Sequence, residues 1–168
     1  MALRPILVAP DPRLKAKCLP VAKVDGEVAR LMDDLLETMY AAPGIGLAAP
    51  QVGASVRVLV IDIAKDGEER QPLRIANPEF VWLSDEDRSY EEGCLSVPEH
   101  YAEVTRPAAL RLRYLDHQNE IRELDAEGLL ATVIQHEMDH LDGVLFIDHL
   151  SNLKRNMILR KLTKARAR

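Results

Sequence analysis

The stretch Ile134-Gln135-His136-Glu137-Met138-Asp139-His140 decides both the fold and the chemistry of this chain. In a helix, residues four apart lie one turn away from each other, so His136 and His140 point the same way. One metal ion can then bind both imidazoles while Glu137 faces a water on that ion. The stretch therefore predicts a helix with a metal site of the water-activating kind found in hydrolases.

The same spacing also arises by chance on solvated helices, where such side chains simply face water. The neighbouring residues argue against this alternative, because Leu129, Leu130, Val133, Ile134 and Met138 leave the helix no broad polar side. That pattern is typical of a helix buried within a domain. Burying two imidazoles and a carboxylate without partners would cost on the order of several kcal/mol, whereas a metal satisfies both rings.

The third ligand decides the class of site. The candidates are His100, His117, His149, Asp139, Asp142, Asp148, Cys18 and Cys94. An extended protease pattern would place a third histidine where this chain has Phe146, which excludes that subclass. Asp139 lies on the wrong side of the helix, and Asp142 is close enough to the helix end to be a cap or a surface charge. Cys94 is therefore preferred.

Cys94 lies in the segment Glu91–Pro98, where Gly93 allows a close backbone approach and Pro98 ends the segment. A thiolate with two imidazoles is a known catalytic ligand set that leaves a fourth position open to water. A lone cysteine is otherwise an inert, buried small hydrophobe, and we keep that interpretation for Cys18.

A third segment, Gly44–Gly53, contains a formal match to a dinucleotide-binding fingerprint. That fingerprint needs a strand before it and a helix after it, and the order here is reversed. What remains is a tight loop of small residues with one amide, Gln51, which can donate a hydrogen bond to a developing oxyanion.

Together the three segments resemble one family, the peptide deformylases. The family's GxGxAAxQ motif reads here as Gly44, Gly46, Ala48, Ala49 and Gln51, its EGCLS motif as Glu92 to Ser96, and its QHExDH motif as Gln135 to His140. The motifs appear without a mismatch and in the family order, and the resemblance runs from about Ala9 to about Ser151.

This resemblance implies that Cys94, His136 and His140 hold one divalent metal and that Glu137 is the general acid/base. Hydroxide on the metal would attack the formyl carbon of an N-formylmethionyl nascent peptide and release formate. Gln51 and the backbone N–H of Leu95 would hold the oxyanion. The family implies ferrous iron in the cell, although zinc, nickel or cobalt suits the same ligands.

The resemblance also implies an apolar pocket for the methionine side chain of the substrate. The implied substrate-binding positions are Gly44, Ile45, Gly46, Tyr90, Leu129 and Val133, with His136 beside them. Ordinary core packing is the alternative for the apolar positions, and periodicity does not separate the two. Apolar pockets discriminate by only about 1–3 kcal/mol per methylene, so some tolerance is expected.

The pattern of the chain predicts an α+β fold, with antiparallel strands packed around a central metal-bearing helix in one domain over residues 1–168. Helices are expected from about Asp25 to Tyr40, after an N-cap at Asp125, and in a basic segment at about 151–168. Strands are expected near Val56–Ile63, Glu79–Leu83, Ala102–Thr105, Ala109–Leu115 and Ile121–Leu124.

Composition places this chain of 168 residues among globular single domains. Its two cysteines give no disulfide framework, which favours a reducing cytoplasm. Its apolar runs are too short for a signal peptide or a membrane span, so we expect no membrane partner, and no DNA partner either.

Charge is unevenly distributed along the chain. From Ser151 onward there are seven basic and no acidic residues; subtracting these seven from 22 basic residues leaves 15 against 27 acidic ones, a formal charge of −12 for the rest. If helical, this tail gathers Ile158, Leu159, Leu162 and Ala165 on one side. It is either a solvated terminal helix or a salt-sensitive contact with ribosomal RNA near the emerging nascent chain.

Two other functions fit the same helix. An ordinary peptidase would activate water in the same way, and an assay of a formylated against an unformylated peptide separates the two. A structural zinc module would close the site with a fourth protein ligand and would have no use for Glu137 as a base.

Overall fold

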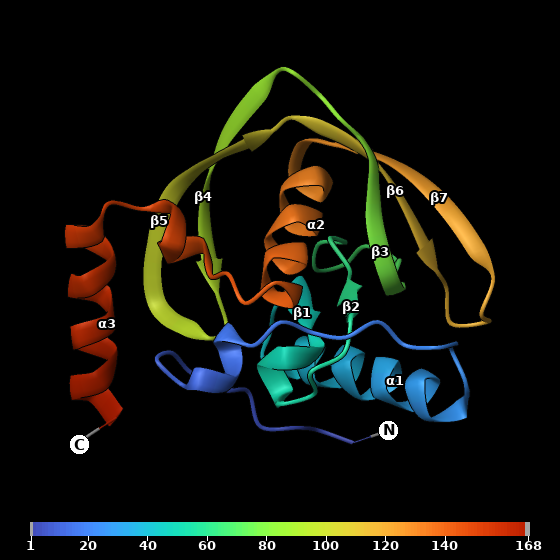
Figure 1. The fold of residues 1–168 in the computed structure, drawn as a ribbon, viewed down its shortest axis with the longest axis horizontal. Helices are drawn as coiled ribbons and strands as arrows, with labels where there is room; N and C mark the ends of the chain where they lie inside the picture. The colour runs from blue at the N-terminus through green and yellow to red at the C-terminus, as the bar shows by residue number, and fades with distance from the viewer. Residues whose placement is uncertain (1, 167–168) are drawn as a thin grey trace.

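The structure, a computed structural model, describes residues 2–166 and has an α+β fold in which a central helix lies between two antiparallel sheets (Figure 1). The fold class expected from the sequence is confirmed. The α-helices are α1 (Gly26–Ala41), α2 (Gly128–Leu141) and α3 (Asn152–Arg166). Three short 3-10 helices are η1 (Pro12–Lys15), η2 (Ala49–Val52) and η3 (Phe146–His149).

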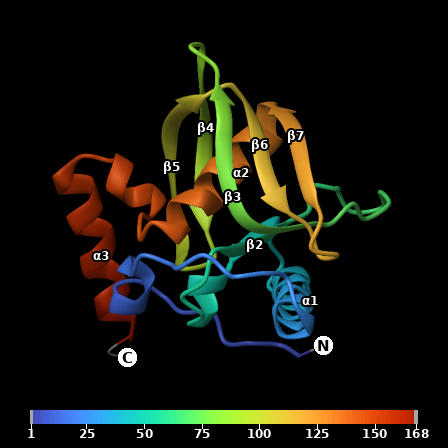
Figure 2. The same ribbon diagram turned by 45° about the vertical axis from the view of Figure 1, so that its right-hand side comes forward.

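The strands form a five-stranded and a two-stranded sheet. The larger sheet has the order β1 (Gly46–Ala48), β2 (Val58–Ile61), β3 (Leu73–Leu83), β6 (Ala109–Leu115) and β7 (Ile121–Glu127). The smaller sheet is the hairpin of β4 (Asp87–Cys94) and β5 (Val97–Pro107). All neighbouring strands are antiparallel. Figure 2 shows β3, β6 and β7 lying across α2, with the hairpin behind them.

Strand β6 shows how the sequence places α2 against the sheet. Leu110 and Leu112 are buried while Arg111 and Arg113 between and after them are exposed, because successive side chains of a strand point to opposite faces. The buried leucines pack in one core cluster with Ile134 and other apolar residues of α2. The helix that carries the metal motif is therefore fixed by the main core of the molecule.

Helix α1 lies against the other end of the larger sheet. The Asp25 side chain accepts a hydrogen bond from the Val28 amide at 2.9 Å and caps the helix, within one residue of the predicted start. Its apolar face, with Met32, Leu35 and Met39 fully buried, packs in a cluster with β1 and β2.

The predicted start of the metal helix at Asp125 is wrong. Asp125 lies in β7, where its carboxylate is 2.7 Å from Nε of Arg111, and α2 begins only at Gly128. Gly128 has a φ of +62°, which turns the strand directly into the helix without a capping side chain. The carboxylate that was interpreted as a helix cap forms an ion pair between two strands instead.

The extents of the other elements also differ from the predictions. Strand β4 was not predicted, because its polar sequence lacks apolar alternation: one face meets solvent and the other carries Glu92, which pairs with Arg106 of β5. The expected loop Gly44–Gly53 contains β1 and η2. Strands β3, β5 and β7 are longer than predicted, β2 is shorter, and β6 has the predicted bounds.

Helix α3 packs on the outside of the hairpin layer. Leu162 is buried against a cluster that includes Phe146 and Ile147, and Ile158 and Leu159 are partly buried there. Ala165 is exposed, and the predicted end of this helix at 167–168 lies outside the described residues. Between residues 2 and 166, no helix has the length and apolar character needed to cross a membrane.

Candidate metal centre and active site

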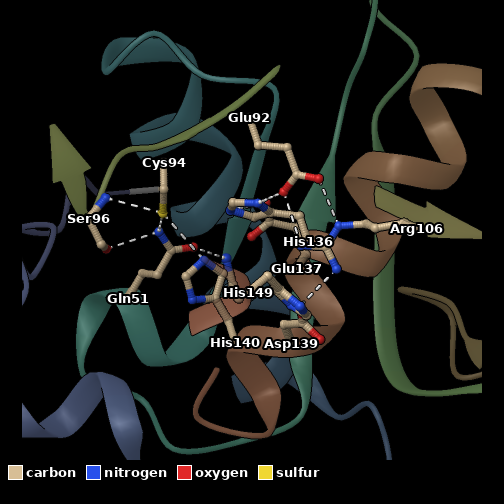
Figure 3. Close-up of polar contacts among 11 residues, drawn as sticks. Gln51, Glu92, Cys94, Ser96, Arg106, His136, Glu137, Asp139, His140 and His149 are labelled. Carbon is tan, nitrogen blue, oxygen red and sulfur yellow. Dashed lines mark hydrogen bonds and ion pairs between the residues drawn. The ribbon is translucent and has the colours of Figure 1, made fainter. Parts of the chain in front are cut away.

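Three possible metal ligands meet where α2 approaches the end of the β4–β5 hairpin (Figure 3). His136 and His140 come from α2, and Cys94 is the last residue of β4. The Cys94 Sγ atom lies 3.4 Å from Nε2 of His140. Sγ and one nitrogen of each ring all lie within 4.8 Å of one another.

These residues fit a metal ion. In a tetrahedral site the metal lies about 2.3 Å from sulfur and about 2.0 Å from nitrogen, so ligand atoms are about 3.5 Å apart. Within the described part of the chain, the group contains three ligating side chains rather than four. A set of three leaves one coordination position for water or substrate, as in catalytic sites.

The pKa values of the two imidazoles are shifted in opposite directions. Burial alone would lower the pKa of His136, but its neighbours Cys94, Glu92 and Glu137 raise it well above the ordinary value. Burial and the charge of His136 lower the pKa of His140. The lowered pKa favours the neutral form of His140, which is the form in which an imidazole binds a metal.

Glu137 lies beside this centre and is almost fully buried, with 4% of its surface exposed. Oε1 has no hydrogen-bond partner among residues 2–166, and Oε2 lies 4.0 Å from Nε2 of His136. Burial raises the pKa of Glu137 to about 7, although His136 opposes the shift. A carboxyl group with this pKa can both accept and return a proton near neutral pH.

Gln51 is held in one orientation at the other side of the sulfur. Its Oε1 accepts a hydrogen bond from the Ala48 amide at 2.9 Å. Its Nε2 therefore faces Ser96 Oγ, at 3.0 Å, and the Cys94 sulfur, at 3.5 Å. The amide nitrogen of Gln51 thus lies beside the sulfur of the candidate metal site. Leu95 lies in the hairpin turn directly after Cys94 and also lines the site.

A cavity of about 650 Å³ opens onto this centre, within the size range of small-molecule sites. All the predicted substrate-binding residues line it: Gly44, Ile45, Gly46, Tyr90, Leu129 and Val133. Ile45 and Leu129 are 42% and 41% exposed, which distinguishes them from ordinary core residues. Val133 is buried, with 6% exposure, and belongs to the core as well.

Two of the other ligand candidates make different contacts. Asp139 is hydrogen-bonded to Arg106 and His149, and Asp142 forms an ion pair with Arg57. Cys18 and Cys94 are both free thiols.

Sequence reasoning gave no role to Glu92, Ser96 or Arg106, although the first two lie within a quoted motif. Glu92 contacts His136, and Arg106 contacts Glu92. A carboxylate and a guanidinium on two strands were the only signal for this ion pair. The signal can be recognised only once β4 is known to pair with β5.

An α+β fold with a Cys-His-His centre beside a buried glutamate defines a metal-binding hydrolase. Residues 3–156 match the family model for polypeptide deformylase. The peptide deformylase of Phenylobacterium zucineum is 63% identical over 164 residues, covering 98% of this chain and 97% of that relative.

Solved structures agree with this match. The crystal structure of peptide deformylase from Ehrlichia chaffeensis in complex with actinonin is similar with a TM-score of 0.94 and 40% identity, covering 98% of both chains. That of a peptide deformylase from Legionella pneumophila has a TM-score of 0.90 and 46% identity, covering 99% of this chain and 96% of the other. The chain belongs to the peptide deformylase family, whose members remove the N-formyl group from nascent peptides.

Proposed function

We propose that Cys94, His136 and His140 hold one divalent metal and that the chain uses this centre to deformylate N-terminal formylmethionine. The observation that carries the proposal is the meeting of three ligand atoms within 4.8 Å at the base of a cavity that Glu137 also lines. When bound, the metal supplies a Lewis acid that polarises the formyl carbonyl and lowers the pKa of a water.

In the proposed reaction, Glu137 accepts the proton of the attacking water and later returns it to the departing amine. Its unpartnered buried Oε1 and its pKa of about 7 support both roles. The Gln51 amide and the backbone N–H of Leu95 donate hydrogen bonds to the developing oxyanion. The fixed orientation of Gln51 supports its part, because its amide nitrogen is already held beside the Cys94 sulfur before the charge forms.

The methionine side chain occupies the apolar part of the cavity in this proposal. Ile45, Leu129 and Val133 supply apolar surface, and Tyr90 also lines the cavity. Gly44 and Gly46 leave room for the substrate backbone beside them. The substrate emerges from ribosomes, so the proposed location is the cytoplasm.

We propose ferrous iron as the metal in the cell. The donor set of one thiolate and two imidazoles also suits zinc, nickel and cobalt, so the ligands do not choose among them. Elemental analysis after anaerobic purification measures the bound metal directly. Zinc in place of iron would overturn this part of the proposal.

The reaction is tested with Glu137→Gln. We expect turnover, measured as formate released from a formylmethionyl peptide, to fall on the order of a hundredfold to ten-thousandfold, because the amide cannot take up the proton. Metal content should stay that of the unchanged enzyme, since Glu137 is not among the ligands.

A matched variant, Glu103→Gln, alters an exposed carboxylate of the same hairpin that does not line the cavity, and it should keep its turnover. An unformylated peptide assayed beside the formylated one should stay intact. Backbone cleavage, or full turnover by Glu137→Gln, would contradict the proposal.

We further propose that the basic face of α3 contacts phosphate groups of ribosomal RNA. Arg160, Lys161 and Lys164 are exposed on this helix, whereas Leu162 anchors it to the core. Neutralising the three cations, rather than deleting the helix, therefore tests charge without exposing the anchor. Co-sedimentation with ribosomes should weaken and become less salt-dependent, while formate release from short peptides is unchanged. Unaltered co-sedimentation would exclude this contact.

A further inference from the structure

A hydrogen-bond chain of side chains leads outward from His136. The proposed reaction gives no role to its members beyond His136. His136 Nδ1 lies 2.9 Å from Oε1 of Glu92 on β4. Arg106 on β5 binds both oxygens of that carboxylate, with Nε at 2.7 Å and Nη2 at 3.0 Å. Figure 3 shows the carboxylate between the imidazole and the guanidinium.

The hydrogen-bond chain continues to the surface. Nη1 of Arg106 donates to Oδ2 of Asp139 at 2.8 Å, and Nε2 of His149 on η3 lies 2.8 Å from the same oxygen. The inner members are buried, with 6% of Glu92 and 5% of Arg106 exposed. The His149 side chain, at the outer end, is 39% exposed.

The contacts of Glu92 determine which nitrogen of His136 faces the metal centre. An ionised carboxylate only accepts hydrogen bonds, and Arg106 keeps Glu92 ionised by binding both its oxygens. Nδ1 of His136 must therefore be the donor, which leaves the Nε2 lone pair for a metal. A carboxylate that shifts or turns would release the ring.

Helix η3 also contacts the same imidazole directly. The Phe146 ring stacks on His136, with 6.0 Å between centroids and 25° between planes. One short helix thus supports the ring through Phe146 on its face and through His149 at the end of the hydrogen-bond chain. His149 is separated from His136 by three intervening side chains, so any effect on the ring must pass through them.

We propose that Asp139 and His149 are positioning residues that hold Arg106 and Glu92 in place and so fix the His136 ring for metal binding. The role belongs to the hydrogen bonds between these side chains, and neither Asp139 nor His149 contacts the metal or the substrate. This proposal rests on the proposed metal centre. It means that contacts of η3 at the surface affect how tightly the metal is held.

The test compares His149→Ala, His149→Gln and Asp139→Ala with the unchanged enzyme. Transfer of the metal to an excess of chelator should become about tenfold to a hundredfold faster in Asp139→Ala, since loss of outer contacts weakens metal sites by this factor. His149→Ala should lie between this variant and the unchanged enzyme. His149→Gln, which keeps an N–H donor, should restore slow release.

A second measurement needs neither metal nor activity. In the metal-free protein, the Nδ1 proton of His136 should be observed by NMR and exchange slowly with water, and His149→Ala should accelerate that exchange. The control is His117→Ala, an exposed histidine in the β6–β7 turn outside the chain of contacts. It should change neither quantity.

Unchanged metal release and unchanged proton exchange in His149→Ala would overturn the inference, even if Asp139→Ala fails to fold. Failure of the proposed metal centre would look different. In that case Cys94→Ser would bind metal as tightly as the unchanged chain, while the NMR measurement would still decide whether His149 positions the His136 ring.

Discussion

Gly46 shows how closely single residues control the geometry of this site. A Cβ atom at Gly46 would lie only 2.6 Å from Oε2 of Glu137, so the absence of a side chain leaves the space that the carboxylate occupies. A flexible carboxylate can move away from an added methyl group, but it then leaves the position from which it acts.

We therefore expect Gly46→Ala to lower kcat on the order of a hundredfold, because a displacement near 1 Å is enough for a loss of this size. Metal content and fold should persist, as checked by elemental analysis and circular dichroism. Gly26→Ala is the control, since a Cβ there meets Arg30 only at an ordinary contact distance of 3.6 Å. Full turnover by Gly46→Ala would show that Glu137 tolerates the shift.

For single residues, the sequence predicts the groupings that form within one segment. Two histidines four apart and the glutamate between them are local information, and in the structure both imidazoles lie within 4.8 Å of the Cys94 sulfur. The contact between Glu92 and Arg106 joins two strands, so its partners are identified only by the register of the hairpin. The same holds for the space that Gly46 leaves for Glu137.

Among the elements, the β6–β7 turn is stabilised by one carboxylate. Asp116 accepts hydrogen bonds from the amides of Gln118 and Glu120, at 2.8 and 3.0 Å, and from Nε of Arg122 at 2.8 Å. Burial alone would raise the pKa of Asp116, but these donors lower it below its ordinary value of 3.8. The ionised form is therefore favoured more strongly in the folded than in the unfolded chain.

The sign of the pH dependence follows from this depressed pKa. The stabilisation is fully present above the unfolded pKa and is lost as the pH falls through the lower folded value. Asp116→Asn should reduce the free energy of unfolding at pH 7, and its difference from the unchanged protein should shrink as the pH falls below about 4. Urea titrations at several pH values measure this, with exposed Asp85→Asn as the control. A difference that stays constant down to pH 3 would refute it.

The accuracy of the predicted elements depends on their apolar patterns. Strand β6 alternates buried leucines with exposed arginines and was predicted with its bounds, and α1 was predicted within one residue. Strand β4 buries a charged residue instead of apolar ones, so it carries no such signal. Asp125 was misplaced because a carboxylate before a helix resembles a cap in sequence even when it pairs across strands.

On the scale of the whole molecule, the proposed metal connects the two layers of the fold. His136 and His140 belong to the central helix packed on the larger sheet, and Cys94 belongs to the hairpin. A metal that binds only the folded chain adds about 2.7 kcal/mol of stability at a concentration one hundred times its Kd.

Removing the metal with a chelator should therefore lower the Tm by roughly 5–10 °C for a chain of this size. Calorimetry with and without added metal measures the shift, and Cys94→Ser should show a much smaller one. If chelation leaves the Tm of the unchanged protein where it was, the centre does not connect the layers.

The separation of the ligands between the helix and the hairpin also provides a way to observe folding. Absorption by charge transfer from sulfur to cobalt(II) requires the sulfur and the cation to be at bonding distance. Refolding in cobalt(II) should therefore develop colour only when the hairpin docks, whereas far-ultraviolet dichroism follows the helices. The interval between the two signals would time the last assembly step of the protein.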